Sequence, residues 1–103
     1  MALDPLLNDL KEKLRITWTD EDDALDKLLK KSKHYIEGIT GARNALAFDY
    51  SVDLTAAELV LEHSRYVYNN AGDEFQQNYH ADLVRLQIQV AIKVGVTNEA
   101  DTP

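Results

Sequence analysis

Helix-breaking residues are scarce in this chain, and that scarcity limits the folds open to it. Only four glycines and two prolines occur among 103 residues, and one of the prolines is the last residue. A protein of many short strands needs such residues at short intervals, whereas a helical protein needs them only between its helices. We therefore expect an all-α protein with a few long helices. The length fits one domain, and a domain this small often gains stability by oligomerising.

Charge and composition argue against several classes of protein. Acidic residues outnumber basic ones by 18 to 11, and the resulting net charge of −7 opposes tight binding to a phosphate backbone. The chain has no cysteine, which excludes disulfides and zinc–thiolate sites and is compatible with the cytoplasm. We expect neither a signal peptide nor contact with a membrane, because no apolar run reaches the roughly 20 residues of a membrane span.

Hydrophobic periodicity predicts a bundle of four helices, at about residues 5–14, 20–37, 54–70 and 74–94. Gly38 and Gly41 are expected to end the second helix. Residues 42–52 are expected to form a loop between the second and third helices. Residues 1–94 would then form the single domain. Residues 95–103 have no period, and we expect them to be a flexible tail that orders on a partner.

The apolar positions of these helices define an expected core. The third helix is apolar over most of its circumference, with Glu58, Glu62 and Arg65 in one narrow charged arc, so we expect it to be the central helix. His63 projects into the apolar part, where a partly buried histidine with one hydrogen bond is expected rather than a ligand. The expected core residues are Leu25, Leu28, Leu29, Ile36, Leu61, Tyr68, Phe75, Tyr79, Leu83 and Leu86.

The fourth helix carries more apolar surface than its own domain needs. Besides the core stripe that contains Leu83 and Leu86, a second stripe lies on roughly the opposite side. Its members are Ala81, Val84, Ile88, Ala91 and Ile92. One stripe is enough to pack a helix on its own domain, so we expect the second to contact a neighbouring subunit.

No motif for catalysis, metal binding or a cofactor stands out. Residues 20–23 read DEDD, but they neither alternate nor contain the glycine of a calcium loop, and acids are favourable at a helix start. His34, His63 and His80 form no metal-binding pair. We therefore expect no enzyme and no cofactor. A DNA-reading helix-turn-helix is an alternative for DLTAAELVLEHSRY at 53–66, although the element that follows carries little positive charge. A small cytoplasmic interaction module is another.

The order and spacing of several weak motifs resemble the head–tail connector (adaptor) family of tailed bacteriophages and prophages. The segment LLNDLKEKLRITWTDEDDALDKLLKKSKHYIEGITG, at 6–41, is similar to the family's amino-terminal pattern of a short helix, an acidic helix start and a helix ending in Tyr-Ile and glycine. The segment LVLEHSRYVYNNAGDEFQQNYHADLVRLQIQ, at 59–89, is similar to its second half, with an aromatic pair, an Asn-Gly break and a leucine-bearing helix. The resemblance covers about residues 5–90.

The resemblance implies a structural protein of the virion, assembled in the host cytoplasm. It implies a ring, about twelve-fold, that forms either alone or only on the portal. The ring would bind the portal protein and join it to a head-completion, stopper or tail protein. DNA would pass through the lumen without specific binding. On this interpretation the tail residues that contact the portal or another partner are Val94, Val96, Thr97 and Asn98.

Overall fold

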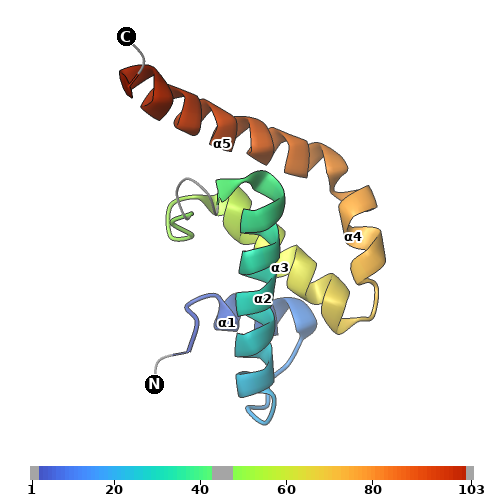
Figure 1. Ribbon diagram of the computed structural model, residues 1–103. Coiled ribbons are helices and arrows are strands. Elements are labelled where there is room, and N and C mark those ends of the chain that lie inside the picture. The colour runs from blue at the N-terminus through green and yellow to red at the C-terminus, as the bar shows by residue number, and fades with distance from the viewer. Residues whose placement is uncertain (1–2, 43–47, 102–103) are drawn as a thin grey trace.

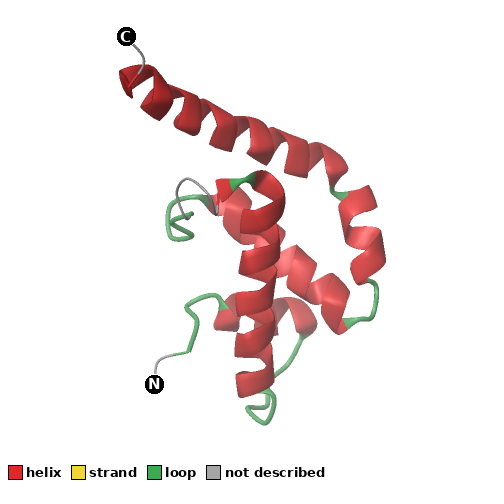
Figure 2. Cartoon of the chain, viewed as in Figure 1, coloured by secondary structure: helices red, strands yellow, loops and turns green. Residues whose placement is uncertain are grey.

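The chain folds into helices joined by short connections (Figure 1). The computed structural model describes residues 3–42 and 48–101, with side chains described as far as residue 93. The helices are α1 (Leu7–Leu14), α2 (Asp22–Thr40), α3 (Leu54–Tyr68), α4 (Gly72–Asn78) and α5 (His80–Asp101). Within the described ranges there is no strand (Figure 2). The expected all-α fold is confirmed, with one helix more than the four expected.

Helix α3 is the centre of the fold. It packs against α1, α2 and α4. The Asp53 carboxylate caps its first turn by accepting a hydrogen bond from the Ala56 amide at 3.3 Å. The buried apolar residues of α3 are Ala56, Ala57, Leu59, Val60 and Leu61. The prediction of a buried central helix is confirmed.

Helix α2 is longer than its glycines suggested. Gly38 lies within the helix, and the chain leaves it only at Gly41, whose φ of 85° is left-handed. The Thr40 hydroxyl donates to the Ile36 carbonyl at 2.7 Å. An interior glycine costs only about 1 kcal/mol relative to alanine, and the packing of Ile36 and Ile39 in this turn outweighs that cost.

The prediction of one continuous helix over 74–94 is wrong, because the helix breaks at Tyr79. The residue has φ −112° and ψ 20°, and it separates α4 from α5. Its ring stacks on the buried Phe75 ring, with centroids 4.9 Å apart, and meets Tyr66 edge-on. Helix α5 then turns back across the end of α2, where the Gln87 amide donates to the Ile39 carbonyl at 2.8 Å.

Residues 95–101, expected to be a tail without helical periodicity, instead continue α5 to Asp101. Gly95 alone does not stop a helix, and alanine and glutamate nearby favour one. The carboxyl-terminal half of α5 projects beyond the rest of the chain (Figure 1). The molecule measures 56 × 33 × 17 Å. Among the described residues, no helix combines the length and apolar character needed to cross a bilayer.

The core forms where α1, α2, α3 and the α4–α5 corner meet. Of the expected core residues, those that are buried are Leu25, Leu29, Ile36, Leu61, Phe75, Leu83 and Leu86. Leu28 and Tyr79 are partly buried against them. Tyr68 is a correction, because it is 37% exposed. It is the last residue of α3, where the chain leaves the core, and its hydroxyl donates to Glu21 at 3.0 Å.

Candidate interaction surfaces

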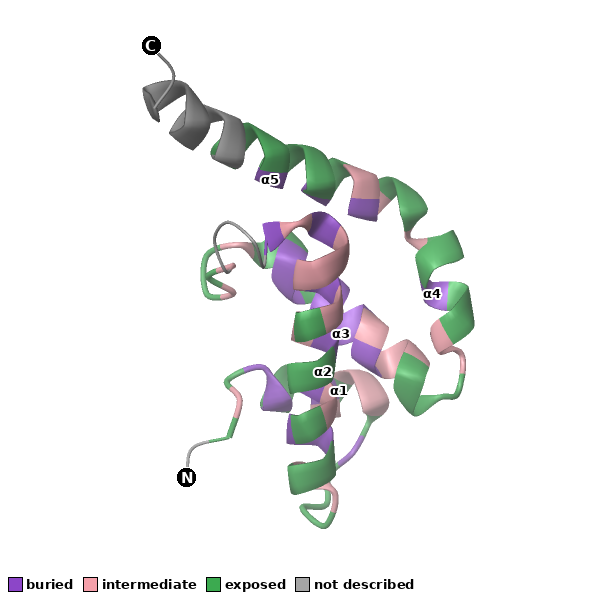
Figure 3. Cartoon of the chain, in the orientation of Figure 1, coloured by how far each residue is buried: buried purple, intermediate pink, exposed green. Residues whose placement is uncertain are grey.

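Helix α5 has one face on the core and one open to solvent (Figure 3). Leu83, Leu86 and Val90 form the inner face and are buried. Ile88 and Ile92 are 54% and 60% exposed. Each is two positions from an inner residue, which is about 200° around a helix, so they point away from the body.

The five residues predicted to contact a neighbouring subunit form one row on this outer face, which we call the outer stripe (Ala81, Val84, Ile88, Ala91 and Ile92). Ala81 and Ala91 are exposed, and Val84 is partly buried. Their spacing of three and four residues aligns them along the helix. The structure contains one copy of the chain, so the neighbour that would cover the outer stripe stays a prediction.

The residues predicted to bind the portal lie in the projecting part of α5. The backbone at Val94, Val96, Thr97 and Asn98 is helical. Their side chains lie outside the part of the chain whose side chains are described.

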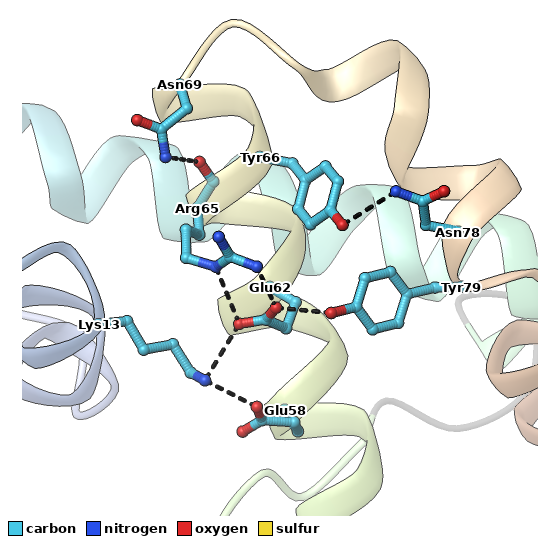
Figure 4. Close-up of polar contacts among 8 residues, drawn as sticks. All are labelled: Lys13, Glu58, Glu62, Arg65, Tyr66, Asn69, Asn78 and Tyr79. Carbon is cyan, nitrogen blue, oxygen red and sulfur yellow. Dashed lines mark hydrogen bonds and ion pairs between the residues drawn. The ribbon is translucent and has the colours of Figure 1, made fainter.

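A buried carboxylate, Glu62, ties α1 and the α4–α5 corner to α3 (Figure 4). It accepts two hydrogen bonds from the Arg65 guanidinium, at 2.7 and 3.2 Å, and one from the Tyr79 hydroxyl at 2.6 Å. The Lys13 ammonium of α1 lies 3.0 Å from it and 2.7 Å from Glu58. The charged arc of α3 therefore faces α1 and Tyr79, and Glu62 within it is shielded from solvent.

The electrostatics of this cluster keep Glu62 ionised. The Arg65 guanidinium lowers the pKa of Glu62 to about 2 against the opposing effect of burial, with help from Tyr79 and Lys13. In return, the Glu62 carboxylate raises the pKa of Arg65 and raises that of Tyr79 to about 12. Glu62 therefore stays a hydrogen-bond acceptor, and Arg65 and Tyr79 stay its donors, over the whole physiological pH range. Tyr79 lies between α4 and α5. Its hydrogen bond to Glu62 therefore also helps to set the direction in which α5 leaves α4.

His63 has the environment that its sequence position predicted. Its Nδ1 lies 2.8 Å from the Ser32 hydroxyl, which also accepts from Ser64 at 2.9 Å. The imidazole stacks on Tyr35, with ring centroids 4.3 Å apart, and meets Phe75 edge-on. Burial lowers the pKa of His63, so a neutral imidazole is favoured. The histidine is part of the packing between α2 and α3.

Two exposed apolar surfaces, one near each end of α3, were not predicted from the sequence. Val52 and Leu54, beside the start of α3, are 73% and 71% exposed, although Leu54 is the first residue of the helix expected to be central and largely apolar. At the opposite end of α3, Trp18 is exposed next to Tyr68, and both donate hydrogen bonds to Glu21. Apolar periodicity does not distinguish an inward residue from an outward one at a helix end, so no sequence signal separates these residues from the core.

A hollow of about 490 Å³ lies beside Leu54. Its walls come from three segments that are distant in the sequence: the residues around the start of α1, the middle of α2, and residues 48–54. The lining residues are Asp4, Pro5, Leu6, Asp9, Lys33, Phe48, Asp49, Tyr50, Ser51 and Leu54.

The acidic residues at the start of α2 have structural partners. Asp22 forms an ion pair with Lys11 at 2.7 Å, and Glu21 accepts from the Trp18 indole at 2.7 Å. Among the described residues, no group of three or more histidines, aspartates or glutamates is arranged to hold a metal ion.

Comparison with known protein families gives a match. The model of the family described as phage gp6-like head-tail connector protein matches residues 5–101. No curated protein and no solved structure matches the chain. The match covers nearly the whole chain, including all five helices, and it agrees with the resemblance carried by the two segments at 6–41 and 59–89. The chain therefore belongs to the family of phage gp6-like head–tail connector proteins.

Proposed function

We propose that this connector assembles as a ring beneath the portal and joins the portal to the next head-completion, stopper or tail protein. In this role it is a structural component of the virion rather than an enzyme, and it reaches the virion from the host cytoplasm, where it is made. A ring of about twelve subunits would match a cyclic portal. Family membership supports the connector role.

The observation that carries the ring is the outer stripe of α5. Large apolar side chains that are more than half exposed, such as Ile88 and Ile92, are unfavourable in a row unless a partner covers them. The stripe lies along a helix that packs on its own domain through the opposite face. A neighbouring subunit would remove the stripe from water at no cost to the core.

The portal contact is assigned to the projecting end of α5, which contains Val94, Val96, Thr97 and Asn98. This end lies farthest from the core (Figure 1), so it is the part of the chain best able to reach another protein. The Glu62–Tyr79 hydrogen bond, at the base of α5, would then orient the projecting end toward the portal.

The acidic balance supports a role in the DNA conduit. A net charge of −7 per subunit is multiplied in a ring, and a negative lumen repels duplex DNA. The duplex would slide through such a lumen without being held.

The test introduces one charge into the outer stripe. Ile88→Asp is expected to lower sharply the number of connector subunits that co-sediment with each portal encoded beside it, because an aspartate would be buried without a partner at each contact between subunits. Gln77→Asp is the matched control, since it adds the same charge at an exposed position of α4. Circular dichroism checks that both variants are folded. Unchanged assembly of Ile88→Asp would rule out the outer stripe as the contact.

A further inference from the structure

A closed ring of more than two subunits needs two different contact surfaces on each subunit. A two-fold pair uses one patch twice, whereas a ring joins one patch to a second patch on the next copy. The outer stripe supplies one surface. The second surface is required only if the chain forms the proposed ring.

The hollow beside Leu54 offers an apolar wall among polar residues. Phe48 and Tyr50 form an aromatic wall, with ring centroids 5.9 Å apart. The Lys33 ammonium lies 4.9 Å from the centre of the Tyr50 ring and 2.6 Å from Asp4, so it fixes the wall to the residues before α1. Leu54 lines the hollow and is itself largely exposed.

The outer stripe of a chain cannot pack into the hollow of the same chain. Ile88 and Ile92 point away from the body, since Leu86 and Val90 hold the opposite face of α5 against it. Figure 3 shows the exposed side of α5 turned away from the rest of the chain, while the segment before α3 lies beside α2. Each surface therefore needs a second molecule.

The two surfaces are also complementary in charge. Arg85 lies on the exposed side of α5 beside Ile88, and its side chain is 67% exposed with only a 3.4 Å contact to Asp82. At the hollow, Lys33 is paired with Asp4, which leaves Asp9 and Asp49 as the exposed acids of the lining. A cation beside the stripe would meet these carboxylates, and such complementarity fixes the register of a contact.

We propose that neighbouring subunits join head to tail, with the outer stripe of α5 from one copy seated in the hollow beside Leu54 of the next. Ile88 and Ile92 cover Leu54 and the aromatic wall of Phe48 and Tyr50. Arg85 faces the acids at the rim. Repetition of this one contact generates the ring.

Cysteine cross-linking tests the pairing directly, because the native chain contains no cysteine. Full-length Ile88→Cys is mixed with full-length Leu54→Cys in the presence of the portal protein, and the second chain is labelled with ¹⁵N so that the three possible connector dimers differ in mass. After mild oxidation, the mixed disulfide is expected to make up a larger share of the dimers than random pairing of the two chains would give. It is also expected to form roughly ten-fold faster than a control pair, because bound partners hold two thiols at a millimolar effective concentration.

The control pair replaces Ile88→Cys by Lys27→Cys, an exposed position on α2. Adding Arg85→Gln to the Ile88→Cys chain is expected to slow the cross-link several-fold at low salt and to have less effect at high salt. This salt dependence does not arise from random collision of exposed thiols.

The outcomes separate this inference from the proposed function. A predominant mixed disulfide supports the head-to-tail pairing. A predominant Ile88–Ile88 disulfide would overturn it while leaving the outer stripe as a contact between copies. Cross-linking no faster than in the control pair would also overturn it, and the proposed function would then be decided separately by binding to the portal.

Discussion

At the scale of single residues, two polar side chains of α3 have the clearest consequences: Glu62, which is buried, and His63, which is partly buried. Glu62 is reached by Lys13, Arg65 and Tyr79, and its removal would leave those groups without their shared acceptor. The sequence did not predict this role, because a charged arc on a helix is typically solvated. Only the tertiary placement of α1 over α3 buries it.

Replacing Glu62 by glutamine is expected to lower the free energy of unfolding by about 1–3 kcal/mol, because a buried, charged hydrogen-bonding group loses its ionic contacts. Glu58→Gln is the control, since Glu58 also contacts Lys13 but is 56% exposed, and surface ion pairs contribute about 0–1 kcal/mol. Urea unfolding measures both. Equal effects would show that the Glu62 cluster does not contribute more than a surface pair.

His63 is expected to make stability depend on pH below neutrality. Burial lowers its pKa in the folded state, so the unfolded chain takes up a proton first as the pH falls below its ordinary pKa of 6.5. The stability contribution is complete above that pH and is lost as the pH falls toward the folded pKa. The slope is at most about 1.4 kcal/mol per pH unit.

Between pH 6.5 and about 5, the change in the free energy of unfolding with pH is attributed to His63. Glu62 contributes to it only below its ordinary pKa of 4.5. Urea unfolding at several pH values should show a slope in this window for the native chain and for His80→Gln. His63→Gln should remove most of it. An unchanged slope in His63→Gln would contradict the account.

At the scale of helices, the sequence predicted the centres well and the ends poorly. The third helix was placed correctly because Val60 and its neighbours follow the helical period without interruption. The break at Tyr79 was missed because the apolar period continues through Phe75, Tyr79 and Leu83. The break accompanies tertiary contacts to α3, namely the edge-on packing of Tyr79 against Tyr66 and its hydrogen bond to Glu62, which periodicity does not contain.

Gly41 marks a helix end where glycine itself matters. Its φ of 85° is left-handed, and an alanine there would be strained even though a Cβ would meet Val90 only at an ordinary 4.0 Å. Gly41→Ala is therefore expected to lower the free energy of unfolding by about 1–2 kcal/mol, as measured by thermal or urea unfolding. A neutral or stabilising effect would indicate that α2 ends differently.

At the scale of the whole molecule, the sequence indicated one interaction surface and not the other. The outer stripe could be recognised because Ile88 and Ile92 form a second apolar row on a helix that already had one. The hollow could not, because Leu54 resembles a core residue and the walls are brought together from 4–9, Lys33 and 48–54 only by folding. Tyr68 was predicted to be a core residue but is exposed, because an aromatic residue at a helix end can remain outside the core.

Assembly with the portal is the central claim. Light scattering on the connector alone and mixed with the portal protein encoded beside it tests that claim most directly. The account predicts a discrete ring, either alone or in a complex that co-migrates with the portal and has the mass of the portal plus a full set of connector subunits. A connector that remains a monomer or dimer and elutes separately from the portal would contradict it.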